Sequence, residues 1–182
     1  MTDLRTRFEQ EALPHLDAAY NLARWLTHSG AEAEDIVQDA LLLAFRNFDR
    51  QRGPSTKAWL LTIVRNCFLS QVRRSAPRAR LTDPIDATGD ALTPPALVSP
   101  ADPEREAIAA ERARSLDEAL GRLSEDYREV LVLRELEGLS YREIAGVTAM
   151  PIGTVMSRLA RARESLRVHW LRATAGSDDA LS

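Results

Sequence analysis

The sequence predicts an all-α protein made of two small helical domains that are joined by a flexible linker. Apolar residues recur at helical spacing on both sides of a central proline-rich segment. No segment alternates apolar and polar residues as a half-buried strand does. A chain of 182 residues is long enough for one domain or two small ones. The central segment favours two.

The N-terminal domain is expected over 1–76. Pro14 suits the first turn of a helix, which runs on to a break at Gly30. The segment 31–48 begins with acids, which suit the positive end of a helix, and continues as an apolar pattern to Phe48. After a short turn, Ser55 or Thr56 can cap a further helix over 57–75.

The central segment 77–103 reads as the linker. Its part from 81 to 103 holds five prolines, four aspartates and no basic residue. Proline lacks the backbone donor of a helix and restricts the residue before it. The alternative is an ordered surface loop, which is uncommon at this length.

The C-terminal domain is expected over 104–173, followed by a disordered tail, 174–182. Ser124 is expected to cap one helix, which stops at Gly138, and Ser140 and Glu143 have the spacing of a capping box. A tight turn then leads to a last helix near Pro151. The order is that of a helix-turn-helix unit.

Positive charge is concentrated in two segments of a chain whose net charge is −3. The segment 57–80 has six basic residues and no acid, and 151–173 has five arginines and one acid. The intervening segments are acidic. Such asymmetry points to a polyanionic partner more directly than the net charge does.

The last helix separates an apolar stripe from a polar face. Val155, Leu159, Ala162 and Leu166 share one side at 100° per residue. Small residues, hydroxyls and arginine lie opposite, at Gly153, Thr154, Ser157, Ala160 and Arg161, with Arg158 at the edge. Small residues allow close approach, and arginine and hydroxyl groups bind phosphates and base edges. The alternative is a solvated charged face.

Several function classes are not supported. The histidines are scattered, no glycine-rich phosphate loop is present, and Cys67 is the only cysteine, so the sequence predicts no enzyme, no metal site, no cofactor and no small-molecule substrate. Cys67 reads as a packed apolar thiol, with a redox sensor as the alternative. No apolar run approaches the ~20 residues that span a bilayer, and no signal peptide is visible. A cytoplasmic location without membrane insertion is therefore expected.

Two blocks resemble a known family. The stretches "AEDIVQDALLLAFRNF" and "AWLLTIVRNCFLSQVRR" are similar to the N-terminal domain of extracytoplasmic-function (ECF) sigma factors of bacterial RNA polymerase. The stretch "LSEDYREVLVLRELEGLSYREIAGVTAMPIGTVMSRLARARESLR" is similar to their C-terminal domain. The resemblance implies that the first domain binds the polymerase clamp and opens the −10 promoter element. It implies that the second domain reads the −35 element.

The resemblance carries roles to particular residues. It implies core polymerase contact by Asp35, Gln38 and Asp39, for which a generic acidic helix start is the alternative. It implies −10 or phosphate contact by Lys57, Asn66, Arg73 and Arg74, although Asn66 can equally be buried and bonded. It implies −35 contact by Thr154, Ser157, Arg158 and Arg161. Trp59 is read as a core residue rather than a base-stacking platform.

Two positions depart from common family patterns. Ala149 stands where the turn often has glycine, so either the turn is strained or it avoids a left-handed backbone. Met156 stands where family members can have Lys or Arg, which leaves a base or phosphate contact from its position in doubt. The expected partners are core RNA polymerase, promoter DNA and an anti-sigma factor. A stand-alone helix-turn-helix regulator is the alternative function, and it would bind its site without polymerase.

Overall fold

The structure, a computed structural model, describes residues 3–75 and 103–178. The described residues are helical with short turns and contain no strand, which confirms the all-α prediction. The predicted linker 77–103 lies outside these ranges, apart from Pro103. The last helix continues to Asp178, past the predicted boundary at 173, and residues 179–182 lie outside the described part.

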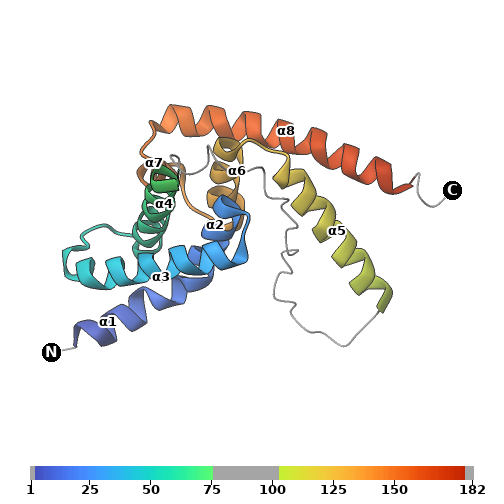
Figure 1. Cartoon of the computed structure of the whole chain (residues 1–182). Helices are drawn as coiled ribbons and strands as arrows, with labels where there is room; N and C mark the ends of the chain where they lie inside the picture. Colours follow the sequence, from blue (N-terminus) through green and yellow to red (C-terminus); the bar gives the residue numbers. More distant parts are fainter. Residues whose placement is uncertain (1–2, 76–102, 179–182) are drawn as a thin grey trace.

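Three helices of the N-terminal half pack against one another. They are α2 (Leu16–Thr27), α3 (Gly30–Asn47) and α4 (Thr56–Ser75), and α1 (Leu4–Glu11) leads into them through a 3₁₀ turn at Leu13–His15 (Figure 1). Ser29 and Ser55 begin α3 and α4, each accepting a backbone N–H bond in the first turn. Their shared core is made by Leu22, Ile36, Leu60, Leu61 and Val64.

Aromatic side chains close this half at the turn between α3 and α4. Phe48, in a short 3₁₀ turn (Phe48–Arg50), is buried, and its ring packs edge-on against Phe8 of α1 at 5.3 Å between centroids. Trp59 of α4 lies on the other side, 6.0 Å from Phe48. These contacts hold the N-terminus of α4 against α3. Offset and edge-on ring contacts are the favoured arrangements.

The C-terminal half is built around its last helix. The helix α8 (Ile152–Asp178) packs on α5 (Pro103–Gly121), α6 (Glu125–Leu131) and α7 (Tyr141–Thr148). The apolar stripe predicted for this helix is buried at Val155, Leu159 and Ala162, and Leu166 is partly buried. Ile144 and Val147 of α7 meet the same core.

A π-helical turn, Val132–Leu136, ends the helix that α6 begins. Its backbone is closed by a bond from the Glu137 N–H to the Val132 carbonyl oxygen, 3.0 Å. Gly138 then adopts φ +68°, a left-handed conformation that glycine takes without steric cost, and the chain reverses toward α7. The turn carries the Glu137 side chain toward the N-terminal half.

The two halves are in contact through more than the connecting segment. The helix α4 packs against α7, and α2 packs against α6 (Figure 1). The buried apolar residues of both halves form one continuous cluster. Sequence reasoning described two domains on a tether and did not predict this packing.

Candidate nucleic-acid and polymerase interfaces

The helix-turn-helix unit is formed by α7 and α8. Ser140 caps α7 in a reciprocal capping box with Glu143, as the sequence predicts. The turn places Ala149 at φ 54° and ψ 36°, so the left-handed conformation is adopted by alanine rather than avoided. Two backbone N–H groups of the first turn of α8 then bond to the Pro151 carbonyl oxygen.

The predicted reading face of α8 points away from the protein core. Ser157 and Arg161 are exposed and Thr154 is half-buried, whereas Arg158 is drawn back by an ion pair with Asp126 of α6 at 3.0 Å. Among the described residues, Arg161 has no carboxylate within ion-pair distance. The neighbouring Arg163 pairs with Glu135 and Arg167 pairs with Glu164. Arg161 is therefore available to a ligand on this face.

Two apolar side chains share the start of the reading helix. Ile152 is 43% exposed and Met156, one turn later, is 53% exposed. In the sequence, Met156 was notable only because it stands where family members can have a basic residue, and Ile152 was not singled out. In a major groove, exposed apolar groups of this kind can contact thymine methyl groups.

The cationic residues of α4 divide into two groups. Arg73 and Arg74 are exposed near its C-terminus, and each donates its Nε–H to the backbone carbonyl four residues earlier. Asn66 is exposed as well, so its side chain faces solvent and is not buried in the core. Lys57 instead faces the C-terminal half, with Nζ 2.9 Å from Oε2 of Glu137 and 2.8 Å from its carbonyl oxygen.

Arg65 belongs to the second group and was not singled out from the sequence. Its Nε lies 2.6 Å from Oε1 of Glu129 in α6. Burial raises the pKa of Glu129, against the opposing effect of Arg65. The sequence shows a basic segment, 57–80, and an excess of acids over 104–150, but the charge asymmetry was interpreted only as a sign of a polyanionic partner.

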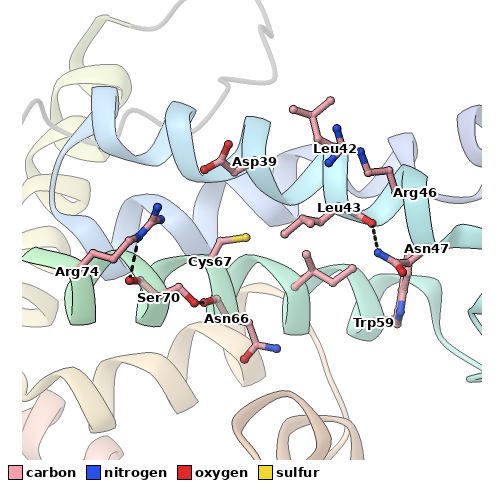
Figure 2. Close-up of a pocket in the computed structure, with 11 residues that line it drawn as sticks. Asp39, Leu42, Leu43, Arg46, Asn47, Trp59, Asn66, Cys67, Ser70 and Arg74 are labelled. Carbon is pink, nitrogen blue, oxygen red and sulfur yellow. Dashed lines mark hydrogen bonds between the residues drawn. The ribbon is translucent and has the colours of Figure 1, made fainter.

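The acidic face of α3 carries the predicted polymerase residues. Asp35, Gln38 and Asp39 are all exposed on this helix. Asp39 also lines a groove of about 580 Å³ between α3 and α4, in which the sulfur of Cys67 is directed toward α3 (Figure 2). Exposed Leu42 and Leu43 form the α3 side of that groove. An acidic surface thus borders a groove whose lining is partly apolar and partly polar.

The same groove explains two residues that the sequence left open. Trp59 is half-buried, contacting Phe48 on one side and lining the groove on the other, so it is more than a core residue. Burial, and then the charge of Asp39, raise the pKa of the Cys67 thiol, although Arg74 opposes the shift. A protonated thiol is a poor nucleophile. This environment favours the packed apolar thiol over the redox sensor.

The described part of the chain offers neither a metal cluster nor a membrane span. It holds no group of three or more histidine, cysteine or carboxylate side chains that could bind a metal ion. None of its helices is both long and apolar enough to cross a bilayer.

Comparison with known proteins accounts for both halves. Residues 13–78 match the Sigma-70 region 2 family and residues 113–166 match the Sigma-70, region 4 family. The ECF RNA polymerase sigma-E factor of Escherichia coli K12 is 36% identical over 140 residues, covering 74% of this chain and 72% of its own length. The chain belongs to the ECF sigma factors.

Further relatives cover more of this sigma factor. The ECF RNA polymerase sigma factor SigW of Bacillus subtilis is 32% identical over 155 residues, covering 83% of this chain and 82% of its own length. Among solved structures, the sigma factor RpoE of Bartonella quintana, in complex with the anti-sigma factor NepR, has a TM-score of 0.70 and 34% identity. That comparison covers 89% of this chain and 95% of RpoE. The fold likeness therefore extends across both halves.

Proposed function

We propose that this ECF sigma factor is an alternative sigma factor that binds core RNA polymerase, directs it to promoters and helps to open the DNA. It acts as a transcription initiation factor in the cytoplasm and not as an enzyme. The observation that carries the proposal is a helix-turn-helix unit with Thr154, Ser157 and Arg161 facing outward. The same chain also contains an N-terminal half that matches Sigma-70 region 2. The relatives named above support the same role.

Polymerase contact is assigned to α3. Asp35, Gln38 and Asp39 present polar groups on one exposed surface, and residues one turn apart on a helix can meet the same partner. The groove beside Asp39 adds apolar area that an acidic surface alone lacks. Acidic groups set orientation and association rate, whereas apolar burial adds affinity.

Promoter contact is divided between α4 and α8. Arg73, Arg74 and Asn66 are assigned to the −10 region, where exposed cations bind phosphates next to opened strands. Thr154, Ser157 and Arg161 are assigned to the −35 element, with Arg158 released from Asp126 when DNA is bound. The first domain corresponds to 1–76 and the second to 104–173.

An anti-sigma factor is the third proposed partner. The support is the likeness to RpoE of Bartonella quintana, whose structure contains the anti-sigma factor NepR, across nearly the whole chain. A tagged copy of this chain is purified from its own cells, and the proteins that co-purify with it are identified by mass spectrometry. An anti-sigma factor should be among them. Recovery of polymerase subunits alone would leave no anti-sigma factor to invoke.

Complex formation with core polymerase tests the proposal most simply. We expect the chain to co-elute with core polymerase in gel filtration and to bind promoter fragments only as that complex. Asp39→Arg should weaken the association with core, whereas Asp17→Arg, an equal charge change at an exposed position of α2, should not. A stand-alone regulator would bind its DNA site equally well without polymerase, and that result would overturn the proposal.

A further inference from the structure

The sulfur atoms carry a chemistry that the proposed function leaves unused. Three of them lie in described residues, at Cys67, Met150 and Met156, and Met1 is outside the described ranges. They differ in exposure. Met156 is 53% exposed, whereas Cys67 and Met150 are half-buried and pack against the apolar core. Of these three sulfurs, that of Met156 is therefore the most open to a reagent in solution.

The thiol and the thioethers also differ in what oxidation requires. A cysteine reacts as its thiolate. Burial, followed by the charge of Asp39, raises the pKa of the Cys67 thiol, so the thiolate is scarce near neutral pH. A thioether has no proton to lose and is oxidised to the sulfoxide directly. Exposure then decides between the two methionines, and it favours Met156 over Met150.

Met156 lies at the start of the reading helix, where the side chains are uncharged. It follows Ile152 by four residues, so the two apolar side chains share one side of the first turns of α8. A Cβ placed at Gly153 would meet no atom within 4 Å, so the surface beside Met156 is open. The segment 150–157 contains no charged residue. Apolar and hydroxyl groups are thus what this end of the helix offers to a base.

We propose that Met156 is an oxidation site, at which a peroxide removes part of the −35 readout. The thioether sulfur attacks one oxygen of hydrogen peroxide and the O–O bond breaks. The leaving hydroxide takes the proton of the transferred hydroxyl group, so the products are methionine sulfoxide and water. The sulfur loses two electrons and the peroxide gains two. The proposal rests on the proposed function, because it places Met156 in the major groove.

Oxidation changes the contact surface and leaves the core of the C-terminal half intact. Met156 lies outside the buried stripe that contains Val155 and Leu159. An apolar thioether gains from contact with a thymine methyl group, whereas a sulfoxide oxygen must give up water to enter the same contact. Burial of one methyl group corresponds to about fourfold in affinity. The oxidised protein should therefore lose at least that factor in −35 binding, and thymine-to-uracil exchange should no longer weaken it.

Peptide mapping of the free chain tests the chemistry without DNA or polymerase. The chain is exposed to hydrogen peroxide at neutral pH, samples are quenched at intervals, and the sulfoxide at each methionine is quantified by mass spectrometry. Met156 should be oxidised before Met150, and Cys67 should still react with a thiol reagent after denaturation. Oxidation of Met150 first, or of both methionines at equal rates, would overturn the assignment of the site.

A holoenzyme that contains the oxidised chain tests the consequence. Peroxide is removed from the treated chain before untreated core polymerase is added, and circular dichroism verifies that the chain is still helical. Binding is measured on a promoter duplex that the untreated holoenzyme selects from random-sequence DNA. The treated wild type should bind at least about fourfold more weakly than the untreated protein. Incubation with both types of methionine sulfoxide reductase, one for each sulfoxide epimer, should restore binding.

Substitutions identify the sulfur that matters, each variant being compared with itself before treatment. Met156→Leu keeps an apolar side chain of similar volume that peroxide does not oxidise, so its binding should not change on treatment. Met150→Leu and Cys67→Ala retain Met156, so they should lose as much as the wild type. Equal loss by Met156→Leu, or no loss by a wild type whose Met156 is fully oxidised, would overturn the proposal alone. An untreated holoenzyme that selects no promoter duplex would overturn the proposed function together with it.

Discussion

Replacing Ala149 by glycine should stabilise the protein. Ala149 lies in the turn between α7 and α8 with φ 54°, where an L-residue other than glycine loses roughly 1–2 kcal/mol. Glycine removes that cost but increases the entropy of the unfolded chain, which opposes folding by about 0.4–1 kcal/mol. The midpoints of the two ranges differ by about 0.8 kcal/mol, so we predict that Ala149→Gly raises the free energy of unfolding by roughly that amount.

The same exchange at a helical position should have the opposite sign. Ala160 is exposed within α8, where Ala→Gly costs about 1 kcal/mol. Gly138→Ala, at φ +68° with open space for a Cβ, should destabilise through its backbone alone. Urea unfolding of the full chain, followed by circular dichroism, measures all three. A destabilised Ala149→Gly protein would refute the assignment of backbone strain to this turn.

Three predictions concern DNA. Arg161→Ala should weaken −35 binding by the holoenzyme by about 1–3 kcal/mol and relax specificity at one base pair. Arg163→Ala should change −35 binding little, because the guanidinium that it removes is already paired with Glu135. Thymine-to-uracil exchange in the −35 element should weaken wild-type binding but not that of Met156→Ala, because the alanine variant has already lost the side chain that would contact the thymine methyl group. Replacing Arg73 and Arg74 together with alanine should slow promoter opening more than closed-complex formation, as followed by permanganate reactivity of the bubble.

Each of these has a contrary outcome. If Arg161→Ala weakened binding equally on every −35 sequence, Arg161 would be a phosphate contact. If uracil weakened the binding of the wild type and of Met156→Ala equally, Met156 would make no contact with the thymine methyl group. Unchanged permanganate reactivity in the double variant would assign Arg73 and Arg74 a role other than opening.

Local features of the fold could be predicted because they depend on neighbours in sequence. The capping box at Ser140 and the buried face of α8 follow from spacing alone, and the structure confirms both. Ser55 could be named as a cap for the same reason. The outward orientation of Ser157 and Arg161 follows from helical periodicity once the buried stripe is known.

The packing of the halves could not be predicted in the same way. Lys57 and Glu137 are 80 positions apart, and nothing local to either residue names the other. Glu137 lies between the π-helical turn, Val132–Leu136, and Gly138 with its positive φ, and this local backbone conformation places its side chain toward Lys57. The groove beside Asp39 could not be predicted because it depends on the relative position of two helices, α3 and α4.

Transcription directed by this chain tests the central claim most directly. Purified core polymerase, with and without the chain, is incubated with fragments of genomic DNA, and the 5′ ends of the transcripts are mapped. The account predicts starts that require the chain and whose upstream DNA shares two elements about two helical turns apart. Transcripts that are identical with and without the chain, from a polymerase shown to be active with another sigma factor, would contradict it.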